Sequence, residues 1–263
     1  MKELLSDLES EYAALDVLVA GLPEDRWASS TPFAGWTVQD EISHLAFFDG
    51  AAVLAMRDPA AFRRQASSFP ADETVFEVTL NRGRGMAPAA LLAWWRRERS
   101  SLLEILDGRE AKDRIPWFGP PMSVRTLATA RLMETWAHGQ DIVDAQGLER
   151  PAADRLRHIA QLGYMTFGWS FSCRNIDPPD KVIRLELAAP GGDIWGWGPG
   201  EADETLRGTA EDFCLVVTQR RHPYDTGLNW DGPATEQWLL CAQAFAGPPA
   251  RGPRPGRFPG HRT

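Results

Sequence analysis

The spacing of apolar residues changes about halfway along the chain, and this change constrains the fold more than any other feature. Up to about residue 145, apolar side chains recur every three or four positions in four long stretches, which is the period of an amphipathic helix. Thr37 and Ser123 precede two of these stretches and are suited to cap a helix, and Pro88 suits the first turn of another. The predicted helices cover residues 2–20, 38–58, 88–107 and 124–145.

Two stretches between these helices show no sustained period. Residues 59–87 are predicted to form a long connection with one short helix near 60–65. Residues 115–122 combine aromatic side chains with Pro and Gly and are predicted to be an irregular apolar loop. Long connections of this kind often border functional sites.

Past residue 150 the pattern changes. A helix is predicted over about 156–173, and residues 182–187 then alternate with period two, turn at 190–193 and return at 194–197, which predicts a β-hairpin. Residues 205–208 are predicted to form a further strand, and Thr209 is predicted to cap the helix that follows it. Residues 238–245 mark a last helix.

These patterns predict an α+β protein with two domains. Residues 1–150 are expected to form a four-helix bundle whose core holds a metal, an architecture in which inward polar residues provide the ligands. Residues 151–246 are expected to form a small α+β domain. Residues 247–263 are rich in Pro and Gly, so this tail is predicted to be mostly irregular.

Composition limits the classes of partner. The formal net charge of −8 argues against binding of nucleic acid or of an anionic membrane through bulk charge, so the expected partner is a small-molecule substrate. No apolar run is long enough for a membrane span, and the acidic start is unlike a signal peptide, which predicts a cytoplasmic protein, either monomer or homodimer. Three scattered cysteines indicate neither a disulfide framework nor a Cys-x-x-Cys site.

The candidate metal ligands are His44, Glu134 and His138. Glu134 and His138 are four residues apart in a predicted helix and therefore share one face. A carboxylate and an imidazole so placed can bind a transition metal together, and His44, beside the apolar stripe of another helix, is the expected third ligand. The alternative is a solvated Glu-His pair on a helix surface and a hydrogen-bonded histidine in the core.

Two histidines, a carboxylate and an open position are typical of catalytic zinc sites, in which the ion ionises a bound water or a bound thiol. Three hypotheses remain open from this pattern. The ion could activate a low-molecular-weight thiol for transfer or isomerisation, it could drive a thiol-independent hydrolysis, lyase or cyclisation step, or the protein could be a non-catalytic metal-binding or sensor protein.

Two blocks of sequence stand out, Gly35-Trp36-Thr37-Val38 with Asp40 and His44-Leu45, and Glu134 with His138 and Asp141. Together they resemble the metal-binding N-terminal domain of the mycothiol-dependent maleylpyruvate isomerases, which belongs to the DinB-like four-helix bundles. The resemblance implies that the zinc ligands of that family correspond to His44, Glu134 and His138, with mycothiol as the cosubstrate. Asp141, one turn after His138, is a candidate to orient a ligand imidazole.

The second half extends the resemblance. Residues 207–210, Asp212 and 215–221 are similar to the sterol-carrier-like C-terminal domain of the same isomerases, whose arginine corresponds best to Arg220, with Arg221 as the alternative. Gln219 stands where that family has glycine, which leaves the substrate open. Over its full length the chain resembles more closely an uncharacterised actinobacterial set of two-domain metal-binding proteins, with which it shares blocks such as 130–141 and 243–249.

Overall fold

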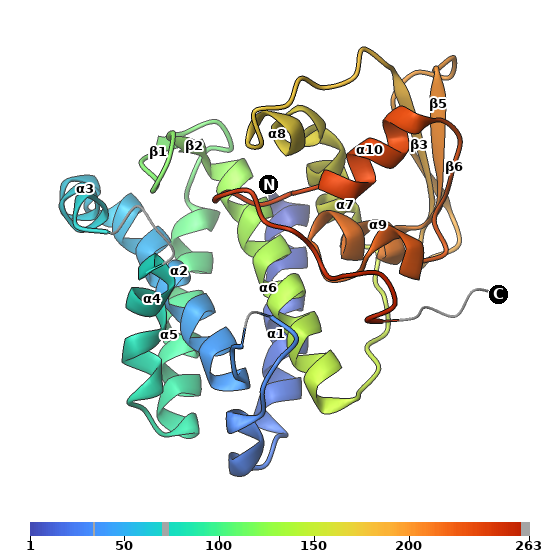
Figure 1. The fold of residues 1–263 in the computed structure, drawn as a ribbon. Helices are drawn as coiled ribbons and strands as arrows, with labels where there is room; N and C mark the ends of the chain where they lie inside the picture. Colours follow the sequence, from blue (N-terminus) through green and yellow to red (C-terminus); the bar gives the residue numbers. More distant parts are fainter. Residues whose placement is uncertain (34, 70–73, 259–263) are drawn as a thin grey trace. The chain divides into compact units, whose positions relative to one another are not determined.

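The structure is a computed structural model that describes residues 1–33, 35–69 and 74–258. The chain divides into two compact units, Met1–Arg150 and Pro151–Thr263, and each is described by itself. The first is almost entirely helical and the second combines a sheet with short helices (Figure 1). The predicted α+β fold class is therefore confirmed.

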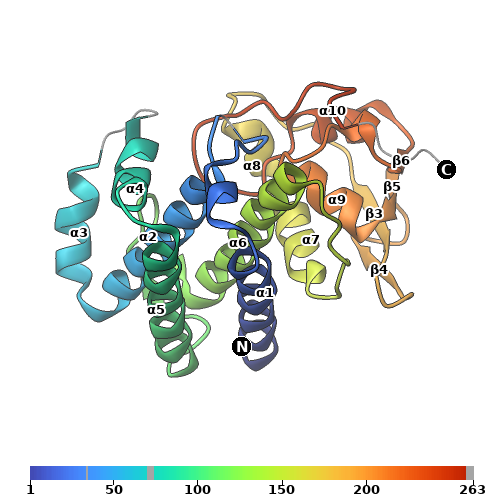
Figure 2. The ribbon, with the colours of Figure 1, turned by 90° about the horizontal axis from the view of Figure 1, so that it is seen from below.

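Four long helices form the bundle of the first unit, and they match the four predicted helices to within a residue or two. Figure 2, which views the bundle from below, shows α2 and α5 side by side and α1 beside α6, in agreement with their contacts. The elements of this unit are α1 (Lys2–Ala20), η1 (Glu24–Ala28), α2 (Val38–Arg57), α3 (Pro59–Ser67), α4 (Thr74–Arg84), α5 (Pro88–Asp107), β1 (Arg114–Ile115), β2 (Met122–Ser123) and α6 (Val124–Gln146).

Side-chain caps fix where α2 and α6 begin. The Thr37 hydroxyl accepts the backbone N–H of Asp40 at 3.2 Å, and the Asp40 carboxylate accepts the N–H of Thr37 at 3.0 Å, which completes a capping box at the start of α2. Ser123 accepts the N–H of Thr126 at 3.0 Å at the start of α6. These caps fix the first turns of the two helices that carry the candidate ligands.

The predicted connection over residues 59–87 is wrong in its second half, because residues 74–84 form α4; residues 70–73 lie outside the described residues. The Ser43 hydroxyl donates to the carbonyls of Thr79 and Leu80, at 3.0 and 3.3 Å. A Cβ at Gly83 would lie 2.3 Å from the Ser43 side chain, so only glycine allows this approach. Because α4 packs against α2 through Gly83 and Ser43, its sequence shows little of the regular spacing of apolar residues that predicts a helix.

A network of buried polar groups links all four long helices. Asp49 of α2, which has no exposed surface, accepts hydrogen bonds from the Tyr12 hydroxyl at 2.8 Å, the Trp95 indole at 3.2 Å and the Arg131 guanidinium at 2.8 Å. Tyr12 belongs to α1, Trp95 to α5 and Arg131 to α6. The network therefore joins α2 to the other three helices at one point inside the core.

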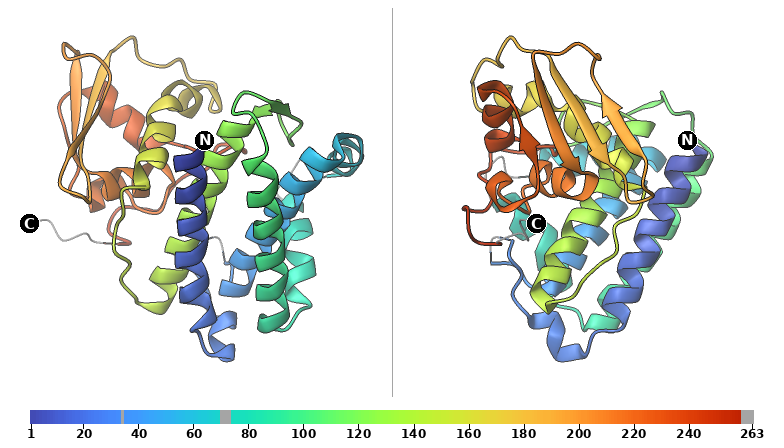
Figure 3. Two further views of the ribbon diagram at one scale, coloured as in Figure 1. Left: turned by 180° about the vertical axis from the view of Figure 1, so that it is seen from behind. Right: turned by 90° about the vertical axis from the view of Figure 1, so that its right-hand side faces the viewer.

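The sheet of the second unit has the strand order β4-β3-β5-β6. The predicted hairpin is confirmed, since β3 and β4 pair antiparallel, whereas β5 pairs parallel to β3 and β6 was not predicted. Figure 3 (left) shows the helices of this unit on one face of the sheet. The elements are α7 (Leu156–Met165), α8 (Phe167–Ser172), β3 (Ile183–Ala188), β4 (Ile194–Trp197), β5 (Glu204–Thr209), α9 (Ala210–Val217), η2 (Pro223–Asp225), β6 (Asn229–Trp230) and α10 (Pro233–Cys241).

Two helices of this unit have other bounds than predicted. The helix expected over 156–173 is divided at Thr166, whose hydroxyl bonds to the carbonyls of Leu162 and Gly163. The last helix begins earlier than predicted, at Pro233, and ends at Cys241, where the N–H of Gln243 donates to the Ser170 hydroxyl instead of continuing the helical ladder. Within the described part of the tail, residues 247–258 contain no helix or strand, as predicted.

None of the described helices is both long and apolar enough to cross a membrane.

Candidate metal centre

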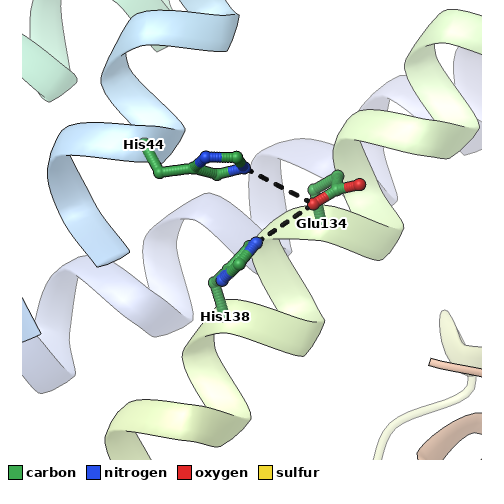
Figure 4. A group of neighbouring side chains, drawn as sticks. All are labelled: His44, Glu134 and His138. Carbon is green, nitrogen blue, oxygen red and sulfur yellow. Dashed lines mark hydrogen bonds and ion pairs between the residues drawn. The ribbon is translucent and has the colours of Figure 1, made fainter. Parts of the chain in front are cut away.

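The three predicted metal ligands come together within the first unit. His44 is on α2, and Glu134 and His138 are one turn apart on α6 (Figure 4). Both imidazoles direct Nε2 at the same carboxylate oxygen, Oε2 of Glu134, at 3.8 Å from His44 and 3.1 Å from His138. One ligand atom from each residue lies within 4.8 Å of the other two.

These separations suit a metal ion. Nitrogen and oxygen ligands at about 2.0–2.1 Å from a tetrahedral zinc ion lie about 3.3 Å from one another. The observed 3.1 and 3.8 Å lie on either side of that value. Two imidazoles and one carboxylate are also a donor set that zinc accepts in catalytic sites, with the fourth position left for a small molecule.

The protonation states favour metal binding as well. Burial lowers the pKa of His44 to about 4, so this imidazole is neutral near pH 7. Burial alone would raise the pKa of Glu134, but hydrogen bonds with His138 and His44 outweigh it and hold the pKa well below its usual range. A neutral imidazole and an ionised carboxylate are the forms that bind metals.

Glu41 is a site residue that the sequence reasoning missed. Its carboxylate lies 2.6 Å from Nδ1 of His138 and accepts the hydroxyl hydrogen of Thr31, also at 2.6 Å. An ionised Glu41 accepts the Nδ1–H of His138, which leaves the Nε2 lone pair directed at the Glu134 carboxylate. Two acceptors 3.1 Å apart repel unless a proton or a metal ion lies between them.

The predicted orienting residue, Asp141, lies 3.6 Å from Nδ1 of His138, so Glu41 is the nearer partner. Burial raises the pKa of Glu41 to about 7, and the negative charge of Asp141 acts in the same direction. The signal for Glu41 in the sequence was its position three residues before His44, which places an acid on the same buried face of α2.

Aromatic rings surround the two imidazoles. Trp36 is stacked on His138, with ring centroids 5.7 Å apart, and also contacts His44 at 5.1 Å. Phe33 meets His138 edge-on at 5.5 Å, and Phe48 contacts His44 at 4.7 Å. The Glu134 side chain is 24 % exposed, against 8 % and 4 % for the two histidines. Solvent therefore reaches the cluster at Glu134.

The remaining predicted residue, Arg220, belongs to the second unit. It is buried, and its guanidinium donates through Nη1 to the backbone carbonyl of Thr218 at 2.7 Å. Its predicted role in holding an anionic group stays a prediction. His158 and His222 also belong to the second unit, outside the candidate cluster.

Comparison with protein families identifies the first unit. Residues 8–143 match the family described as the mycothiol maleylpyruvate isomerase N-terminal domain, a range that covers more than half of the chain and contains all three candidate ligands. The chain belongs to this family. Two uncharacterised proteins from two strains of Mycobacterium tuberculosis are each 46% identical to it over 253 residues, which cover 94% of this chain and 97% of theirs.

Two solved structures share the fold over most of the chain. The crystal structure of a mycothiol-dependent maleylpyruvate isomerase superimposes with a TM-score of 0.58, and that of its histidine-to-alanine mutant with 0.61. Each comparison covers 89% of this chain and 95% of the other, at 14% sequence identity. At this level of identity the likeness concerns the fold.

Proposed function

We propose that this protein is a metal-dependent enzyme whose ion, zinc by the nature of its donors, is held by His44, Glu134 and His138. The observation that carries the proposal is the convergence of two imidazole nitrogens and a carboxylate on one point from two helices. A zinc ion bound there would supply Lewis-acid chemistry, lowering the pKa of a thiol or water at its open position.

The surrounding residues of the chain have separate tasks in this proposal. Glu41 holds the Nδ1–H of His138 and so directs Nε2 to the ion. Trp36 covers both imidazoles and keeps water from that side of the cluster. Glu134, the most exposed of the three ligands, lies where a small molecule can enter.

We further propose that the nucleophile is a low-molecular-weight thiol of the mycothiol type and that the substrate is a small electrophile. Family membership supports this choice, together with the fold shared with a mycothiol-dependent maleylpyruvate isomerase. In an isomerisation the thiolate adds to an activated double bond, rotation follows about the resulting single bond, and elimination regenerates the double bond and the thiolate. In a transfer the thiolate displaces a leaving group and the carbon–sulfur bond remains.

Metal analysis tests the ligand set. The purified protein is expected to bind about one equivalent of zinc per chain, and the double variant His44→Ala/His138→Ala is expected to lose it. The matched control is His158→Ala/His222→Ala, which also removes two histidines but only from the second unit, and it should retain the metal. Full zinc content in the first double variant would contradict the proposed site.

Cobalt substitution tests the thiol. Mycothiol added to the cobalt protein is expected to produce a sulfur-to-cobalt charge-transfer band, because a cation at this position stabilises the thiolate near neutral pH. Arg220→Ala should leave the band unchanged and weaken turnover of anionic electrophiles only. An unchanged spectrum at saturating thiol, with turnover of substrate in its absence, would refute the thiol mechanism and favour a thiol-independent reaction.

A further inference from the structure

A cluster of six aromatic side chains lies beside the candidate metal centre. We call it the aromatic cluster. Its rings come from α2, α3, the residue two positions after α3, and the loop between β1 and β2, so separate parts of the first unit contribute to it. Neighbouring ring centroids are 5.0–6.2 Å apart. The members are Phe47, Phe48, Phe62, Phe69, Trp117 and Phe118.

The aromatic cluster is continuous with the metal ligands through Phe48. The Phe48 ring lies 4.7 Å from that of His44 on one side, and 6.2 and 5.5 Å from those of Trp117 and Phe118 on the other. A molecule whose reacting atom lies at His44 could therefore rest its remaining part on these rings without leaving the first unit.

The aromatic cluster packs against buried residues of the core, Ala51 and Ala55, and keeps part of its own surface exposed. Only Phe62 is fully buried, at 1 % exposure, while the other five rings are each partly exposed. Single exposed apolar side chains are common, but a contiguous group of partly exposed rings is typical of a binding surface.

We propose that the aromatic cluster binds an apolar, ring-containing part of the substrate while the reacting part lies at His44, Glu134 and His138. This inference rests on the proposed function for the position of the reaction and adds the substrate class. Offset or edge-to-face contact with Phe48, Trp117 and Phe118 favours flat rings over short polar chains. A small dicarboxylate gains nothing from such a surface, so the preferred electrophile carries an aromatic or similarly apolar group.

A series of metal-binding probes tests this class. Acetohydroxamate, benzohydroxamate and 2-naphthohydroxamate share one chelating group and differ only in the apolar part. Calorimetric titration of the zinc protein is expected to show affinity rising about tenfold or more from acetyl to phenyl and again to naphthyl, since each ring removes apolar surface from water. Equal affinities for all three would overturn the proposal and leave the metal site intact.

Two variants of the aromatic cluster test which residues provide the gain in affinity for the ring-bearing probes. Trp117→Ala and, as a milder change, Phe118→Leu should each reduce the ratio of the affinity for 2-naphthohydroxamate to that for acetohydroxamate at least fivefold. The affinity for acetohydroxamate itself should stay the same. Trp169→Ala is the matched control, because Trp169 is also a partly exposed tryptophan but belongs to the second unit. Thermal melts identify a variant that fails to fold. If 2-naphthohydroxamate still binds more tightly than acetohydroxamate by the same factor in both Trp117→Ala and Phe118→Leu, the proposal is overturned.

An experiment on the metal-free protein separates this inference from the proposed function. If no hydroxamate binding depends on zinc, the proposed metal site fails. The aromatic cluster is then judged by saturation-transfer NMR of 2-naphthohydroxamate on the metal-free protein. A ring signal that Trp117→Ala abolishes and Trp169→Ala preserves supports the cluster, and the absence of any signal in the unaltered protein overturns it.

Discussion

Arg131 and Asp49 form a buried ion pair between the two helices that carry the candidate ligands. Asp49 is five residues after His44 on α2, and Arg131 is three residues before Glu134 on α6, with Nε of Arg131 2.8 Å from the Asp49 carboxylate. Their side chains are 0 % and 3 % exposed. We predict that the two single changes, added together, cost the metal-free protein more stability than the double change does, because each single change leaves the other charge buried without its partner.

The structure sets the magnitudes. Arg131→Met leaves the Asp49 carboxylate buried with only the neutral donors of Tyr12 and Trp95, and loss of one partner of such a pair costs about 3–5 kcal/mol. Asp49→Leu leaves a buried guanidinium and two neutral donors without their acceptor, so its cost lies at the upper end of that range. The double variant removes both charges, and only the two neutral donors remain to be satisfied.

The assay is a double-mutant cycle of urea unfolding on chelator-treated protein, so that metal binding does not contribute. The double variant is expected to be more stable than the sum of the two single changes predicts, by at least about 2 kcal/mol. Burial raises the pKa of Asp49 and the charge of Arg131 opposes this rise, so the cost of Arg131→Met should shrink as the pH falls. Single effects that add to within about 0.5 kcal/mol would refute the reasoning.

Three further predictions concern other parts of the first unit. Glu41→Gln should lower zinc affinity about 10–100-fold in a chelator competition, because His138 loses its anionic partner, while the control Asp144→Asn should not. The hydrogen bond from Arg96 and the charge of Arg99 lower the pKa of Asp16 against the effect of burial, so its ionised form stabilises the fold above about pH 4. That contribution is lost as the pH falls through the lowered pKa, so urea curves of the protein and of Asp16→Asn should converge in acid; a constant difference would contradict this. A chain ending at residue 150 should melt cooperatively in circular dichroism, because its four long helices share a buried core and the polar network at Asp49, and a broad non-cooperative melt would count against independent folding.

Local signals made most of the bundle predictable. Thr37 and Ser123 are side-chain caps that act within four residues of chain, so the starts of α2 and α6 could be read directly. Glu134 and His138 share a helix face by spacing alone, and the structure brings His44 to them. The hairpin of β3 and β4 was equally local, since one short turn joins its strands.

Contacts between distant residues explain what the sequence did not reveal. Glu41 resembles an ordinary acid in the first turn of a helix, and only the approach of α6 makes it a partner of His138. The parallel pairing of β5 with β3 depends on how the chain crosses over, which strand periodicity does not record. α4 packs through Gly83, whose contribution to packing is the absence of a side chain.

The division of the candidate ligands between two helices also bears on folding. Two of them are one turn apart on α6, whereas His44 precedes Glu134 by about ninety residues, so an ion held by all three closes a long loop. Chain-entropy arguments for a cross-link of that length give about 4–5 kcal/mol, gained by restricting the unfolded chain. Such an ion would be a reversible cross-link between α2 and α6. Cells short of zinc would then hold less of the folded protein as well as less of its activity.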